Sequence, residues 1–197
     1  MKFQILLYDG FDALDAVGPA EVLRMAAKAG ADFEVEFVTL EGRRPVDSAY
    51  GTTLLATEKL SARHEAVVIV PGGGWIDRSK HMHQGAYMEF KKGIIPAALV
   101  HHYNQGAIIA TVCTGAMLAG ELLKGRRAVT HQGALEDLRQ AGANIVNARV
   151  VDDGDLLTSG GITSGIDLGL HLVARFASKE LAEDLSRRLE WMGEPVA

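Results

Sequence analysis

The chain alternates short, almost continuously apolar runs with longer stretches in which apolar residues recur at helical spacing. An apolar run of strand length is typical of a strand that is buried on both faces of a sheet. The pattern therefore predicts four such strands, at residues 3–8, 33–40, 66–74 and 107–113, of which the third ends in a glycine-rich loop.

The helical stretches lie between and after these strands. Gly18-Pro19 marks the start of the first helix, because proline is favoured at the first helical position, and Gly30 is a suitable C-cap. Further helices are predicted over residues 84–103, where Pro96 can kink or split the segment, and over residues 114–125, 133–142, 163–177 and 179–191.

Near the C-terminus, Asp153-Gly154 separates two apolar runs within residues 147–161 and predicts a hairpin. Residues 126–131 are short and strand-like. The alternation of strands and helices predicts an α/β fold, a three-layer sandwich with a mainly parallel, flavodoxin-like sheet flanked by helices. Sites in such sheets form beyond the carboxyl ends of the strands, which here are the loops after residues 8, 70 and 112.

Composition narrows the class of protein. Of the 197 residues, 48% are hydrophobic and 23% are charged, as in ordinary globular proteins. The single cysteine excludes an internal disulfide, and no apolar run approaches the roughly 18 residues of a membrane span. The net charge of -5 does not suggest a nucleic-acid or membrane partner. We therefore expect a cytoplasmic protein with one domain over residues 1–197.

The only cysteine, Cys113, lies where a predicted strand meets a predicted helix, in the sequence VCTGA. Such a turn is the design of a nucleophile elbow, which lifts the side chain above the sheet. Gly115 and Ala116 leave room for the bend, and the helix N-terminus would stabilise a thiolate. A cysteine that merely packs in the core fits the same pattern, so both interpretations stay open at this point.

Residues 70–77 (VPGGGWID) place three glycines directly after a strand. Glycine lets backbone N–H groups approach a ligand closely. An oxyanion hole needs such a donor, together with a second one from the residue after the nucleophile, here Thr114. The phosphate-loop motifs GxxxxGK[ST] and GxGxxG do not occur here. A flexible turn is the plain alternative.

Three aspartates, Asp9, Asp12 and Asp15, follow the first strand. Carboxylates near a helix start usually serve as caps or balance the helix dipole. A carboxyl group held against a thiol is instead able to move a proton during catalysis. The spacing of the three residues does not choose among them.

The histidines give weaker signals. His131 ends the strand-like segment, at the edge where a catalytic base would lie, but a structural hydrogen bond explains it equally well. The pairs His81/His83 and His101/His102 lack the spacing of a metal site. We therefore expect surface histidines, no metal and no cofactor.

Several separated phrases together resemble the ThiJ/PfpI superfamily, which has the class I glutamine amidotransferase-like fold. They cover nearly the whole chain in the right order: LYDGFDALDAVGPAEVL, VIVPGGG, ATVCTGAMLAGELLKGRRAVTH and LLTSGGITSGIDLGLHLV. The phrases LDxxGP, CTG and TSGGxTxGIDL are most similar to the isonitrile hydratase branch, and the sensory domains of some AraC-type regulators share them. Thr114 stands where protease-like members have histidine, which argues against a peptidase.

The resemblance implies a role for each candidate residue. Cys113 would be the nucleophile, and Asp15 would be the acid whose carboxyl contacts its sulfur. Gly73 and Thr114 would supply backbone N–H groups to an anion site, and His131 would lie near the cysteine without a firm triad. The family also implies a homodimer with the site near the interface.

The activity that the resemblance favours is that of a lyase which adds water to a small isonitrile and releases an N-substituted formamide. One alternative is a glutathione-independent glyoxalase or another enzyme that acts on small electrophiles. The other alternative is a non-catalytic sensor of a ligand or of oxidation, because an exposed thiol of low pKa is readily oxidised.

Overall fold

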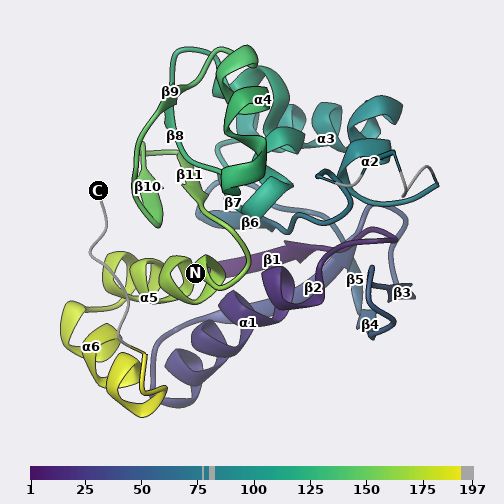
Figure 1. Cartoon of the computed structure of the whole chain (residues 1–197). Helices are drawn as coiled ribbons and strands as arrows, with labels where there is room; N and C mark the ends of the chain where they lie inside the picture. Colours follow the sequence, from purple (N-terminus) through teal and green to yellow (C-terminus); the bar gives the residue numbers. More distant parts are fainter. Residues whose placement is uncertain (77, 80–82, 192–197) are drawn as a thin grey trace.

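A seven-stranded sheet forms the middle layer of the computed structural model, which describes residues 1–76, 78–79 and 83–191 (Figure 1). The strand order is β10-β11-β7-β6-β1-β2-β5. All neighbouring strands are parallel except β10 and β11. The predicted α/β fold with a mainly parallel sheet is confirmed. The strands are β1 (Lys2–Leu6), β2 (Glu34–Thr39), β5 (Glu58–Lys59), β6 (Ala66–Val70), β7 (Ile108–Val112), β10 (Val150–Asp152) and β11 (Leu156–Ser159).

Helices cover both faces of this sheet, which completes the three layers (Figure 1). Both faces of the central strands are therefore buried, and this explains why all five residues of β6 are apolar and buried. One face carries α1 (Ala13–Lys28), α5 (Ser164–Phe176) and α6 (Lys179–Arg188). The other carries α2 (Ala86–Lys92), α3 (Ile94–Asn104), the 3-10 helix η1 (Cys113–Leu123), a short 3-10 turn η2 (Gln132–Ala134) and α4 (Leu135–Gln140). Within the described residues, we find no helix with the length and apolar character that a membrane crossing requires.

The first helix starts earlier than the sequence pattern predicts. Helix α1 begins at Ala13, with Asp12 as its N-cap, and Pro19 lies inside it rather than at its first position. The Asp12 side chain caps this earlier start, because it accepts a hydrogen bond from the Leu14 N–H. Close packing against α5, where a Cβ atom at Gly169 would lie only 2.8 Å from the Cβ atom of Val22, helps to offset the hydrogen bond that a proline inside a helix removes.

Other differences concern the edges of the fold. Two short pairs lie outside the main sheet: β3 (Arg44–Asp47) with β4 (Thr53–Ala56), which the pattern did not predict, and β8 (Arg127–Ala128) with β9 (Asn144–Ile145). The predicted helix over residues 84–103 is divided at Gly93, which has a left-handed φ of 72°. Pro96 lies in the first turn of α3, where proline is tolerated.

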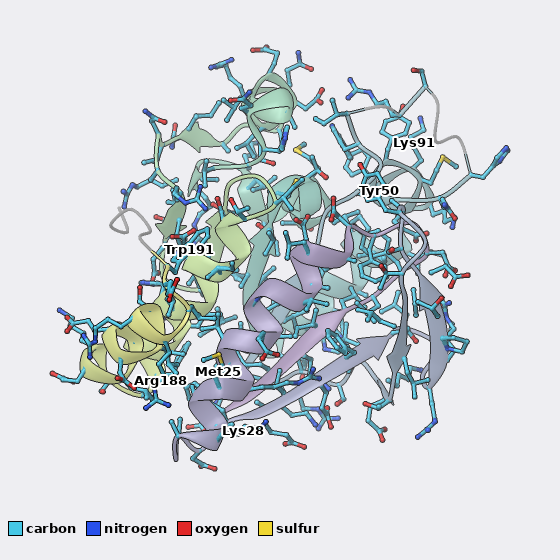
Figure 2. The ribbon with its side chains drawn as sticks, turned by 60° about the horizontal axis from the view of Figure 1, so that its bottom comes forward. Met25, Lys28, Tyr50, Lys91, Arg188 and Trp191 are labelled. Carbon is cyan, nitrogen blue, oxygen red and sulfur yellow. The ribbon has the colours of Figure 1, made fainter. Side chains whose placement is uncertain are left out.

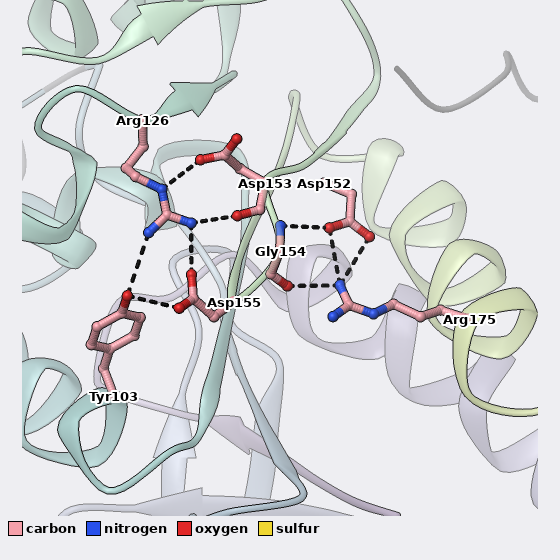
Figure 3. A network of polar contacts seen from close by, with 7 residues as sticks. All are labelled: Tyr103, Arg126, Asp152, Asp153, Gly154, Asp155 and Arg175. Atoms are coloured by element: carbon pink, nitrogen blue, oxygen red, sulfur yellow. Dashed lines mark hydrogen bonds and ion pairs between the residues drawn. The ribbon is translucent and has the colours of Figure 1, made fainter.

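The predicted hairpin at Asp153-Gly154 is present and joins β10 to β11. Two arginines from outside the hairpin hold it (Figure 3). Arg126 Nε donates to Asp153 at 2.5 Å and Arg126 Nη2 donates to Asp155 at 2.6 Å, while Arg175 Nη1 donates to Asp152 at 2.9 Å. These contacts fix the start of β11, whose end leads into the loop beside Cys113.

Gly115 lies so close to the backbone after β6 that a side chain at this position should destabilise the protein. A Cβ atom there would lie 2.2 Å from the Val70 carbonyl oxygen and 2.7 Å from that of Pro71. Because both neighbours are backbone atoms, we expect Gly115→Ala to destabilise the protein by about 3 kcal/mol or more. Chemical denaturation measures this loss.

Gly154→Ala is the matched control. Its φ of 86° makes an alanine strained, but no atom lies within 4 Å, so it reports backbone strain alone, about 1–2 kcal/mol. Equal losses for both variants would contradict the steric explanation.

Candidate active site

Cys113 has a left-handed backbone, with a φ of 57°, directly after β7. This conformation costs roughly 1–3 kcal/mol in a residue other than glycine and persists only where its surroundings enforce it. The Cys113 N–H donates to the Gly160 carbonyl at 2.9 Å, and the Cys113 carbonyl accepts from the Thr130 hydroxyl at 2.7 Å. The cysteine is therefore held on a sharp strand-to-helix turn.

The glycine-rich loop after β6 lies directly against this turn. A Cβ atom at Gly72 would lie 2.5 Å from the Thr114 Oγ1 and 2.6 Å from the Thr114 nitrogen. The Gly73 N–H donates to the Thr114 Oγ1 at 3.1 Å. The glycines therefore let two loops come into contact, and the Gly73 N–H expected at an anion site already has a partner in the resting structure.

Asp15 lies in the first turn of α1 and is completely buried. Its Oδ2 accepts a hydrogen bond from the Gly72 N–H at 2.8 Å, its buried Oδ1 has no partner among the described residues, and the thiol of Cys113 lies near the carboxyl. Burial, and next the charge of Asp12, raise the pKa of Asp15 from 3.8 to about 8, although the contacts with Gly72 and Cys113 lower it. The structure thus brings together the two residues that the resemblance pairs.

The thiol of Cys113 is also difficult to ionise. Burial, and then the charge of Asp15, raise its pKa to about 12, while hydrogen bonds from the backbones of Ile162 and Thr114 lower it. The expected stabilisation of a thiolate by the helix N-terminus is outweighed, because the cysteine is only 6% exposed. The resting thiol therefore keeps its proton at neutral pH.

A pocket of about 210 Å³ opens above the sulfur. Tyr50, which Figure 2 labels, comes from the loop between β3 and β4. It lines this pocket and is 83% exposed. Asp15 does not reach this pocket, whereas Asp12 does. The lining residues are Asp12, Ala49, Tyr50, Gly73, Gly74, Trp75, Ile76, Cys113, Thr114, His131 and Ile162.

His131 lines the same pocket, but its ring is hydrogen-bonded to the backbone. The Nδ1 atom accepts from the Gly133 N–H at 3.0 Å, which caps the short turn η2. Within the described part of the chain, the ring makes no hydrogen bond with Cys113. A Cβ atom at Gly161 would lie 2.6 Å from the His131 Cδ2, so the loop after β11 holds the ring in place.

Trp75 separates this pocket from a larger cavity. Its ring is 4% exposed and lines both spaces, of which the second has a volume of about 520 Å³. The indole Nε1 donates to Asp137 Oδ2 at 2.6 Å, which fixes the ring. Tyr87 and Phe90 of α2 stand edge-on to it in the larger cavity.

The other histidines that the structure describes are not gathered into a site. His81 lies outside the described residues. His101 is exposed on α3, and the Nδ1 atom of His102 lies 2.7 Å from the Ala62 carbonyl oxygen. Among the described residues, no three His, Cys, Asp or Glu side chains are placed to hold a metal ion.

Three features of the site had no clear signal in the sequence. Thr130 and Ile162 hold the cysteine backbone and sulfur through contacts that span 17 residues or more of chain. Asp12 was one of three equivalent candidates, and only its placement as the N-cap of α1 turns it toward the pocket. The phrase SGGITSG marks the loop of Ile162 but does not reveal its contact.

Fold and site together define an α/β protein with a cysteine on a strained strand-to-helix turn and a buried carboxyl partner. A model of the DJ-1/PfpI family matches residues 1–175, and the chain belongs to this family. It is 31% identical over 198 residues to an isonitrile hydratase from Pseudomonas putida, covering 99% of this chain and 80% of that protein.

Two further proteins are similar over most of their length. A Parkinson disease protein 7 homolog from Danio rerio is 26% identical over 193 residues, covering 94% of both chains. The solved structure of a ThiJ/PfpI family protein from Pseudomonas syringae superposes with a TM-score of 0.78 at 26% identity, covering 98% of this chain and 76% of that one.

The charge of Asp15 should slow the reaction of the Cys113 thiol with alkylating reagents. At about pH 9 this carboxyl is ionised and opposes the thiolate, so Asp15→Asn should lower the thiol pKa and accelerate alkylation by iodoacetamide. Each pKa unit is worth about tenfold in thiolate. Asp9→Asn, a change on an exposed residue of the same loop, should leave the rate unchanged. An unaltered rate in Asp15→Asn would refute the coupling.

The same carboxyl should make stability depend on pH. Between its ordinary pKa of 3.8 and the raised value of about 8, folded Asp15 keeps a proton that the unfolded chain releases. Stability therefore falls as pH rises through this window, by about 1.4 kcal/mol per pKa unit at most. Urea unfolding at about pH 5 and pH 9 should show a loss in the wild type that is smaller in Asp15→Asn. A loss of equal size in both proteins would argue against this explanation.

Proposed function

We propose that this protein is an isonitrile hydratase-like lyase, which adds water to a small isonitrile to give an N-substituted formamide. The observation that carries the proposal is the pairing of Cys113 with the buried carboxyl of Asp15 beside a pocket of about 210 Å³. Similarity to an isonitrile hydratase over 99% of the chain supports the choice of reaction. The small pocket favours a small substrate.

The first half of the reaction attaches the substrate to the cysteine. The sulfur attacks the terminal carbon of R–N≡C, and the thiol proton passes through the Asp15 carboxyl to the same carbon. The product is a thioimidate, R–N=CH–S–Cys113, with no atom lost. A carboxyl whose pKa is about 8 is well suited to this transfer, because it gives and takes a proton near neutral pH.

The second half releases the formamide. Water adds to the thioimidate carbon, one of its protons moves to the nitrogen, and the C–S bond then breaks. The hydroxyl proton leaves as the carbonyl forms and restores the thiol. The intermediates are held by backbone donors: the Thr114 N–H lies at the sulfur, and the Gly73 N–H contributes once it leaves the Thr114 hydroxyl.

The low exposure of Cys113, at 6%, favours the lyase over a sensor of oxidation, because a thiol that senses oxidants must be accessible to them. The predicted homodimer belongs to the proposal, and exposed apolar side chains support it: Leu14 and Val17 on α1, and Tyr50 and Ile76, which line the pocket. The cytoplasmic location and the single domain stay predictions.

Parallel assays with cyclohexyl isocyanide and methylglyoxal test the proposal. We expect formamide formation by the wild type, none by Cys113→Ala, and a loss of about 100-fold or more in Asp15→Asn, because a positioned acid contributes that much. Asp9→Asn should be fully active.

Two results would redirect the assignment. Conversion of methylglyoxal without any hydration of the isonitrile would favour the glyoxalase-type alternative. Full isonitrile turnover by Cys113→Ala would eliminate covalent catalysis by the cysteine.

A further inference from the structure

A second carboxyl group belongs to the site, and neither the family resemblance nor the comparisons assign it a role. Asp12 lines the pocket that holds Cys113, whereas Asp15 is fully buried and does not. The Asp12 backbone N–H donates to the Gly72 carbonyl at 2.8 Å, which ties the start of α1 to the glycine-rich loop. Its position is therefore fixed by the same loop that holds Asp15.

The Asp12 carboxylate accepts few hydrogen bonds and is therefore free to accept a proton. Its Oδ1 accepts one long hydrogen bond, from the Leu14 N–H at 3.3 Å. Within the described part of the chain, Oδ2 accepts none. Asp12 is 9% exposed, so the group is largely shielded yet open toward the pocket. Partial burial raises its pKa above 3.8, which makes the carboxylate a stronger base than an exposed aspartate.

His131 also lines the pocket, and its hydrogen bonding makes it a poor base. Because Nδ1 accepts from the Gly133 N–H, the proton of a neutral ring lies on Nε2. The ring then presents a donor and no free acceptor to the pocket. Among the described residues that line the pocket, Asp12 carries the carboxylate and is the one best suited to take a proton.

We infer that Asp12 is the general base that activates water in the second half of the proposed reaction, while Asp15 serves the thiol in the first half. This role rests on the proposed function. In this second half, the water comes from the pocket, whose wall includes Asp12 but not Asp15. Asp12 accepts a proton from the water as the O–C bond forms and returns it to the nitrogen. No further reactant is needed.

Asp12→Asn tests the role with little structural disturbance, because asparagine is as good an N-cap as aspartate and keeps an acceptor for Leu14. We expect the variant to form the thioimidate but to hydrolyse it about 100-fold or more slowly. Intact mass spectrometry after mixing with cyclohexyl isocyanide should show the protein plus one isonitrile. Asp15→Asn should instead form the adduct slowly, and Asp9→Asn should behave as the wild type.

The outcomes separate the two claims. Turnover at the wild-type rate in Asp12→Asn, without accumulation of the adduct, would overturn the role of Asp12 and leave the hydratase proposal intact. Slow turnover without an adduct would overturn it as well, since the block would then precede the covalent step. A wild type that neither turns over nor binds isonitriles covalently would overturn the hydration and the role of Asp12 together.

Discussion

The contact between the turn after β7 and the loop after β6 is the constraint on which the rest of the site depends. Parallel pairing places Val70 beside Thr111, so the two strands end at the same edge of the sheet. Beyond that edge, the loop after β6 and the turn after β7 approach so closely that Gly72 and Gly115 have no room for a side chain. This contact fixes the Cys113 backbone and directs the Gly72 N–H at Asp15.

The contact also sets the electrostatics of the site. Because Asp15 and Cys113 are both buried, burial raises the pKa of each group; the charge of Asp12 raises that of Asp15 further, and the charge of Asp15 raises that of Cys113. The resting pair therefore stays neutral and reacts as a proton-bearing unit. A neutral thiol with an adjacent acid suits an isonitrile carbon, which needs a nucleophile and a proton at the same atom.

The layers of the fold follow from the apolar pattern of the sequence, because strands buried on both faces leave a continuous apolar run, as in β6. The same pattern places Cys113 on a strand-to-helix turn. It does not single out Asp15 among the three aspartates. The pattern predicts a helix start at Gly18-Pro19, whereas α1 begins at Ala13 with Asp12 as its cap, so only the resemblance selects Asp15. The raised thiol pKa and the contact of Ile162 depend on burial and on long-range packing, which local spacing does not encode.

Trp75 gives the molecule a property of practical use. Its indole forms the wall between the two cavities and is fixed by Asp137, whereas the second tryptophan, Trp191, donates to Asp167 of α5 at 2.9 Å. The chain contains just these two tryptophans. Their fluorescence therefore comes from one indole in the wall of the cysteine pocket and one that is bound to α5 and serves as a reference. Binding of a ligand in the pocket should change the emission of Trp75, so that binding is measurable without a label and without turnover.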